Sequence, residues 1–86
     1  MPYNISFTKD VVTLHIPALP TANAEQIKKA IEQRLTVDPV GLGKPLRNNL
    51  KGYFRLRVGD YRVVYRVQGN TVIISVIKHR KDVYDQ

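Results

Sequence analysis

The sequence predicts a small α+β domain in which one main helix lies on a β-sheet. Three observations support this fold class. Residues 53–58 and 61–67 alternate apolar and polar side chains on either side of a Gly-Asp pair, as the two strands of a hairpin do. Residues 24–36 repeat apolar side chains at helical spacing. Residues 71–77 form an apolar run of strand length.

The predicted hairpin has one apolar face and one basic face. Because side chains alternate between the two faces of a strand, Phe54, Leu56 and Val58 share the side that faces the core. Pairing of the strands gathers arginines and one aromatic ring on the opposite side: Tyr53, Arg55, Arg57, Arg62 and Arg66. Such a surface suits a polyanion. The simpler alternative is a solvated face on which arginine stems cover apolar surface.

The segment before the main helix predicts one strand and one short helix. Residues 3–7 alternate apolar and polar side chains, which is typical of a strand. Residues 9–16 fit a brief helix that Pro17 ends, against the preference of their β-branched side chains. His15 lies among apolar neighbours, which favours a partly buried or surface histidine over a catalytic one.

The main helix, residues 24–36, is predicted to pack on the sheet through an apolar stripe. Asn23 and Gln26 have the spacing of a capping box at its start. The other sides of the helix are polar, as expected for a helix with one buried face. The stripe consists of Ile27, Ile31 and Leu35.

Two further segments complete the chain. Residues 37–46 contain two prolines and two glycines, which predicts irregular structure. They are not a phosphate loop, because Pro45 follows Lys44 where such a loop has Ser or Thr. Residues 71–77 predict an internal strand sheltered on both faces, which leads into the basic segment 78–84.

Length and composition exclude several kinds of function. A chain of 86 residues can build one modest core, so residues 1–86 are expected to form a single domain. The chain has no cysteine, which excludes disulfides and thiolate metal sites. No apolar run approaches the length of a membrane span, and the first residues lack the pattern of a signal peptide. We therefore expect a cytoplasmic protein without a metal or other cofactor.

The charge balance predicts an anionic partner. Fourteen Lys and Arg residues oppose seven Asp and Glu residues, giving a net charge of +7. For so small a domain this excess favours nucleic acid as the partner, with an acidic protein second. A membrane surface is less favoured, because no basic helix carries a strong opposite apolar face.

Three stretches of the chain form a recognisable combination. They are residues 46–50, residues 52–65 with their Arg-Val-Gly-Asp-Tyr-Arg core, and residues 79–84, His-Arg-Lys-Asp-Val-Tyr. Together they resemble the RelE branch of the RelE/ParE toxins, over nearly the whole chain. The resemblance implies a βααβββ fold with a curved, mostly antiparallel sheet packed on one or two N-terminal helices. It also implies the toxin of a type II toxin–antitoxin system, which cuts messenger RNA in the ribosomal decoding site.

In that family the ribose 2′-hydroxyl attacks the adjacent phosphate without a metal ion. The reaction needs a base, cations for the charge on phosphorus and an acid for the leaving oxygen. The resemblance makes Arg62 the phosphate-stabilising arginine, with Arg55 beside it. It places the C-terminal catalytic cation among Lys78, His79 and Arg80, because the strand register alone does not distinguish the three. Tyr84 matches a tyrosine that stacks on the base or aids proton transfer. Further RNA contacts are expected from Lys51, Tyr53, Arg57, Arg66, Arg80 and Lys81.

The general base is open between two residues. Some members of the family carry a lysine where this chain has Tyr53, and arginine cannot replace it because arginine stays protonated. Lys51 would serve if its neighbours favoured its neutral form, whereas histidine titrates near neutrality without help, which favours His79. A surface histidine that closes a strand is an equally simple interpretation of His79.

Three alternatives to RNA cleavage follow from the same residues. A ParE-like toxin would share the fold and poison DNA gyrase. A non-catalytic module would bind RNA through its arginines and tyrosines, and a degenerate toxin would mainly bind its antitoxin. In every toxin reading we expect a hetero-oligomer with a cognate antitoxin, whose acidic, partly disordered segment folds onto the basic surface.

Overall fold

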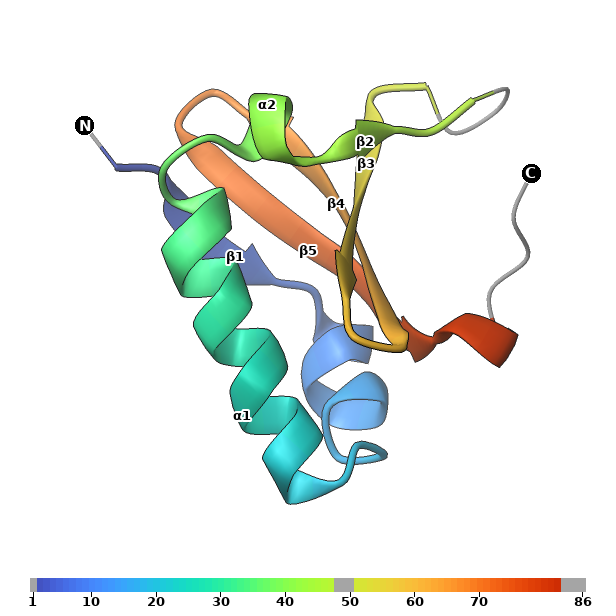
Figure 1. Ribbon diagram of the computed structural model, residues 1–86. Helices are drawn as coiled ribbons and strands as arrows, with labels where there is room; N and C mark the ends of the chain where they lie inside the picture. Colours follow the sequence, from blue (N-terminus) through green and yellow to red (C-terminus); the bar gives the residue numbers. More distant parts are fainter. Residues whose placement is uncertain (1, 48–50, 83–86) are drawn as a thin grey trace.

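A mixed β-sheet is the centre of the structure (Figure 1). The computed structural model describes residues 2–47 and 51–82. Within these residues the strands follow the order β1-β5-β4-β3-β2, with β1 parallel to β5 and all other neighbours antiparallel. The strands are β1 (Asn4–Phe7), β2 (Lys44–Pro45), β3 (Tyr53–Val58), β4 (Tyr61–Gln68) and β5 (Thr71–His79). The predicted α+β class and mostly antiparallel sheet are confirmed.

The two predicted helices are present with different starting points, and two further short helical segments were not predicted. The helical segments are η1 (Val11–His15), α1 (Thr21–Ala30), η2 (Ile31–Leu35), α2 (Pro39–Leu42) and the turn η4 (Arg80–Asp82). The short η1 has the wider turns of a π-helix and precedes Pro17. The main helix is α1 continued by η2, and it lies along one side of the sheet (Figure 1). Within the described ranges, every helix is too short or too polar to cross a bilayer.

The predicted capping box is wrong. The main helix begins three residues earlier than expected, so Asn23 and Gln26 lie inside it. Pro20 precedes the first turn in an extended conformation (φ −56°, ψ 145°), and no side chain caps the helix. The Pro20 carbonyl accepts the backbone N–H of Ala24 at 2.9 Å. A proline can start a helix in this way because its restricted φ matches the first turn.

The core lies between the main helix and one face of the sheet. Leu56, Val63 and Ile77 face one another across β3, β4 and β5, and each is at most 4% exposed. They belong to one cluster with Ile27 and Ile31 of the main helix. Burial of each such side chain contributes about 1.5–3 kcal/mol. The predicted apolar stripe therefore packs on the predicted apolar face.

The predicted hairpin is confirmed in register and in facing. Arg57 lies opposite Arg62, and Tyr53 lies opposite Arg66. Gly59 opens the turn with φ of 58°, a left-handed conformation that glycine adopts at little cost. The two-residue turn keeps the alternation of both strands in phase.

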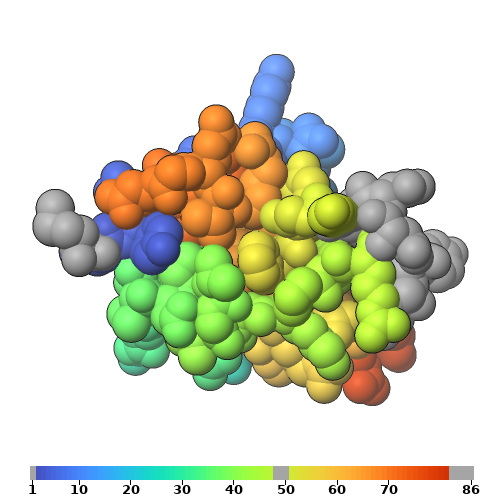
Figure 2. Space-filling view, turned by 90° about the horizontal axis from the view of Figure 1, so that it is seen from above, coloured from blue at the N-terminus to red at the C-terminus, as the bar shows by residue number. Residues whose placement is uncertain are grey.

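Residues 37–46 are more regular than predicted. Asp38 caps α2 by accepting the backbone N–H of Gly41 at 2.9 Å, and Pro39 follows at the first helical position, where its missing N–H costs nothing. Lys44 and Pro45 form β2 at the edge of the sheet, where a strand tolerates proline. Figure 2 shows this segment (green) beside the start of β3 (yellow).

Strand β5 is internal, as predicted, but only one of its faces is buried. Val72, Ile74 and Ile77 are buried, whereas Ile73 and Val76 are half-exposed on the other face. The pairing of β4 with β5 contains a β-bulge, because Val64 lies opposite Val76 while Tyr65 lies opposite Ile74. The bulge leaves Ser75 as an extra residue in β5, and bulges of this kind bend a strand and increase its twist.

Tyr65 connects the sheet to α2. Its hydroxyl donates a hydrogen bond of 2.6 Å to the Pro39 carbonyl, and its ring stacks on Phe54 at 5.7 Å. Burial, helped by the negative charge of Asp38, raises the pKa of Tyr65 to about 12, so the hydroxyl keeps its proton. The chain passes so close at Gly43 that any side chain there would collide with the Tyr65 ring hydroxyl.

Replacement of Tyr65 by phenylalanine tests this connection. Tyr65→Phe should lower the free energy of unfolding by about 1–3 kcal/mol, because it leaves the buried Pro39 carbonyl without its donor. Tyr53→Phe is the matched control, since Tyr53 lies half-exposed on the other face of the same hairpin. Urea denaturation of both variants measures the difference, and equal losses would contradict a special role for Tyr65.

Candidate functional site

Three cations form a row across the sheet, on the face opposite the core. Arg57 of β3 lies directly opposite Arg62 of β4, and Arg62 lies directly opposite Lys78 of β5. Because neighbouring strands are about 4.8 Å apart, the row spans about 10 Å. The row is the centre of the basic face that the sequence predicted.

The row is unfavourable for stability. Like charges directly opposite each other on a sheet destabilise it. Arg62, in the middle, is only 7% exposed, while Arg57 and Lys78 are exposed. An anion bound at the row would offset this cost.

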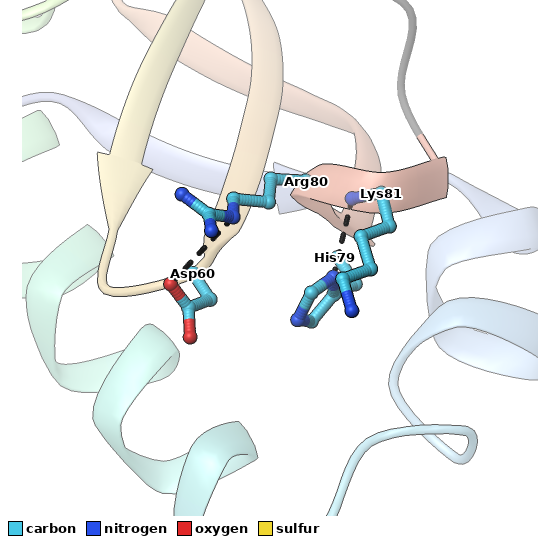
Figure 3. Close-up of polar contacts among 4 residues, drawn as sticks. All are labelled: Asp60, His79, Arg80 and Lys81. Carbon is cyan, nitrogen blue, oxygen red and sulfur yellow. Dashed lines mark hydrogen bonds and ion pairs between the residues drawn. The ribbon is translucent and has the colours of Figure 1, made fainter.

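A small pocket lies at the end of the hairpin beside the row. Its volume is about 120 Å³, and Arg57, Arg62 and Arg80 line it together with Gly59, Asp60 and Tyr61. Arg80 forms an ion pair of 3.9 Å with the Asp60 carboxylate (Figure 3). Its backbone N–H also donates a hydrogen bond of 2.8 Å to the Asp60 carbonyl. One guanidinium group can donate two parallel hydrogen bonds to two oxygens of a phosphate, so this pocket suits a phosphate-sized anion.

The rest of the predicted basic face continues from the row along the hairpin. Arg55 is two residues from Arg57, about 6.6 Å along β3. Tyr53 and Arg66 lie opposite each other at the far end, about 13 Å from the row, and Arg66 donates a hydrogen bond of 3.0 Å to Gln68. The face is therefore long enough for successive phosphates of one nucleic-acid strand.

Lys44 is a basic residue of this face that sequence reasoning missed. It lies in β2 directly opposite Arg55, and both line a cavity of about 400 Å³ with Arg57 and Leu42. The segment was expected to be irregular because of its prolines. The signal that could have identified it is Pro45 itself, since proline is compatible with an edge strand.

The structure does not bring His79 to the row. His79 lies opposite Tyr61, on the helix side of the sheet, and the two rings meet edge to face with centroids 5.2 Å apart. Its Nδ1 accepts the backbone N–H of Lys81 at 3.2 Å, and Figure 3 shows the ring apart from the Arg80–Asp60 pair. His79 therefore neighbours the row in sequence but faces the other way.

The remaining predicted site residues lie around the margin of the sheet. Lys51 is exposed in the turn before β3, near the end of the strand that is about 13 Å from the row. Lys81 is exposed in η4. Tyr84 lies outside the described residues. No three His, Cys, Asp or Glu side chains within residues 2–47 and 51–82 are arranged to bind a metal ion.

His15 is half-buried and hydrogen-bonded to the sheet, in agreement with the structural role expected for it. Its Nδ1 accepts the backbone N–H of Ile77 at 3.3 Å. Burial and the positive charge of Lys78 lower the pKa of His15, and Asp10 opposes this shift. The folded protein therefore favours the neutral imidazole.

This shift predicts that stability falls in acid. Because the pKa of His15 is below its ordinary value of 6.5 in the folded state, the unfolded chain binds the proton more readily. The free energy of unfolding should therefore decrease as the pH drops below 6.5. In His15→Asn, whose amide oxygen can still accept from Ile77, urea denaturation should show a smaller decrease. The same decrease in both proteins would contradict the assignment.

The cation row predicts a stabilising substitution. At low salt, Arg57→Gln should raise the free energy of unfolding by about 0.5 kcal/mol, because it removes one like charge opposite Arg62. The gain should shrink at high salt, which screens exposed charges. Arg34→Gln, at an exposed arginine of η2, controls for the lower net charge. An equal gain in the control would show that the row is not specifically strained.

Known proteins with the same sequence pattern identify the family. A family model described as "ParE toxin of type II toxin-antitoxin system, parDE" matches residues 6–84. The toxin RelG of Mycobacterium tuberculosis is 35% identical in an alignment that covers 98% of this chain and 98% of that protein. The toxin RelE of the same organism is 34% identical over 88% of this chain and 77% of that protein.

Solved structures agree with these relatives. The toxin–antitoxin complex RelBE2 from M. tuberculosis contains a chain with a TM-score of 0.82 and 32% identity, covering 93% of this chain and 100% of that one. The RelB–RelE complex from Methanococcus jannaschii gives a TM-score of 0.73 and 30% identity over 93% of this chain and 95% of that one. The chain belongs to the RelE/ParE superfamily of type II toxin–antitoxin toxins, as the resemblance to RelE implied.

Proposed function

We propose that this toxin is an endoribonuclease that cleaves messenger RNA on the ribosome, a substrate that would place its action in the cytoplasm. The observation that supports the proposal most strongly is the row of Arg57, Arg62 and Lys78. Like charges that lie directly opposite each other on neighbouring strands reduce stability. The occurrence of such a row therefore favours a polyanionic substrate, which would neutralise it. The adjoining arginine pocket has the size and donors for one phosphate.

In the proposed reaction, a ribose 2′-oxygen attacks the adjacent phosphorus and the 5′-oxygen of the next nucleotide leaves. The products are a 2′,3′-cyclic phosphate and a 5′-hydroxyl. Arg62, with Arg57 and Arg55, would stabilise the negative charge that develops on the phosphoryl oxygens, and Lys78 would stabilise or protonate the leaving oxygen. Tyr84 is proposed to stack on a base or aid proton transfer.

The general base is proposed to be one of two residues, Lys51 or His79. Lys51 lies far along β3 from the row, whereas His79 is adjacent to Lys78 but faces the helix side. His79 is thus the nearer candidate, and it would need the RNA to pass around the end of β5. Separate substitutions, Lys51→Ala and His79→Gln, distinguish the two.

We also propose that an antitoxin binds this chain. The solved relatives from M. tuberculosis and M. jannaschii are toxin–antitoxin complexes. An acidic segment of such a partner would neutralise the basic face and block access of RNA. Val40 and Leu42 are about half-exposed beside Lys44, so apolar contacts would add to the charge pairing.

Mapping of new RNA ends tests the nuclease proposal. Purified protein is added to a defined messenger RNA, free and on programmed ribosomes. We expect cuts on ribosomes, and a loss of about 100-fold or more in Arg62→Ala, because Arg62 would stabilise charge in the transition state. Arg62→Lys should bind but cleave poorly, since lysine lacks the paired donors. Arg34→Ala, far from the row, should cleave normally.

Two other outcomes lead to different functions. If a folded protein produces no cuts in either setting, RNA cleavage is wrong and DNA gyrase inhibition is measured next. This second candidate is favoured by the ParE description of the matching family model. If RNA binds without cleavage, and charge-preserving substitutions leave binding intact, the chain is a binding module.

A further inference from the structure

A second cavity lies on the helix side of the sheet, around the strand end from the cation row. Its volume is about 450 Å³. Leu14, Leu19 and Ile77 give it an apolar lining, and two imidazoles, His15 and His79, line it as well. The cavity therefore combines apolar surface with ring nitrogens from two distant parts of the chain. The proposed cleavage involves His79 and Lys78 at the edge of this cavity but assigns no role to its apolar lining or to His15.

The hydrogen bonds of the two imidazoles fix which nitrogen a ligand could meet. In both rings Nδ1 accepts a backbone N–H, from Ile77 at 3.3 Å and from Lys81 at 3.2 Å. A neutral imidazole has one donor and one acceptor, so Nε2 carries the hydrogen in His15 and in His79. The lowered pKa of His15 agrees with this neutral form. The two Nε2–H groups therefore give the cavity hydrogen-bond donors.

The cavity adjoins the arginine pocket. Tyr61 lines both of them, and Lys78 belongs to the cation row while also lining the larger cavity. A phosphate among Arg57, Arg62 and Arg80 would therefore lie on one side of Tyr61, with the apolar, aromatic cavity on the other side. A charged pocket next to an apolar cavity matches the two parts of one nucleotide, a charged phosphate and a flat base.

We propose that this cavity binds a base of the RNA strand whose phosphate occupies the arginine pocket, and that its donors select guanine. Guanine presents two adjacent acceptors, N7 and O6, whereas adenine replaces the second with a donor. Tyr61 and His79 supply ring surface for the base. The inference rests on the proposed RNA substrate and gives His79 a role in recognition in place of general base.

A carboxylate-bearing peptide could use the same donors. The nucleotide is favoured because the phosphate-sized pocket shares Tyr61 with the cavity, and because edge-to-face rings line it. A peptide carboxylate would need neither feature. The experiment below includes a peptide to distinguish the two ligands.

Binding of non-cleavable RNA tests the proposal. The probes are fluorescent uridine pentanucleotides with guanosine or adenosine at the centre, 2′-O-methylated throughout so that no 2′-hydroxyl can attack. Fluorescence anisotropy should show about 10-fold tighter binding of the guanosine probe, the discrimination typical of a pair of donors. Arg57→Gln should weaken the binding of both probes equally, because Arg57 would contact the phosphate and not the base.

Two substitutions of His79 distinguish the contribution of its Nδ1 acceptor from that of its Nε2 donor. His79→Asn keeps an acceptor for the Lys81 N–H but removes the Nε2 donor, and it should abolish the guanosine preference. His79→Gln places an amide N–H near the Nε2 position and should keep part of the preference. An unchanged ratio in His79→Asn, or no preference in the unsubstituted protein, overturns the proposal. A general base would alter cleavage rates and leave this binding ratio unchanged.

The imidazole resonances give an independent readout, because the chain contains only two histidines. In ¹⁵N-detected spectra the guanosine probe should shift the signals of both His15 and His79. The proposal is overturned if neither moves, or if an acetylated Leu-Glu dipeptide moves both and the probe does not. A guanosine preference without any cleavage would reject only the nuclease, and cleavage without the preference would reject only this inference.

Discussion

The structure depends on the pairing register of β4 with its two neighbours. This register places Leu56, Val63 and Ile77 side by side under the main helix. The adjacent residue in each strand points to the other face, so the same register places Arg57, Arg62 and Lys78 side by side there. The apolar row supplies the stability that keeps the charged row assembled. A slip of one residue in either pairing would exchange the two faces and destroy core and site together.

The same geometry separates the two kinds of chemistry in the domain. The opposed cations Arg57, Arg62 and Lys78 lie on the open face, while the two imidazoles lie on the helix side, where the Nδ1 atom of each accepts a backbone N–H. Tyr61 is the boundary between them, because it lines the arginine pocket and the histidine cavity. A substrate that reaches both must therefore pass around the end of the hairpin.

Much of this arrangement could be predicted from local patterns. Strict alternation on either side of Gly59-Asp60 determined the hairpin, its register and the facing of Arg57 and Arg62. The resemblance added one cation among Lys78, His79 and Arg80, and only the structure shows that Lys78 lies opposite Arg62. The prediction failed at two prolines, because proline is compatible both with irregular structure and with the ends or edges of regular elements. Pro20 starts the main helix, and Pro45 sits in an edge strand, so both positions depend on neighbours that a local pattern does not include.

The facing of Lys78 and His79 could not be predicted for a different reason. Ser75 is inserted in β5 relative to β4, and everything after it is shifted by one residue. In an unbroken ladder Ile77 would stand opposite Arg62, and Lys78 would be turned toward the hydrophobic interior against Tyr61. The added residue thus changes which side of the sheet the odd- and even-numbered residues face in the two halves of β5. It allows the two halves of β5 to follow different alternations, so that Ile74 and Ile77 both face the core while Lys78 faces the other side of the sheet.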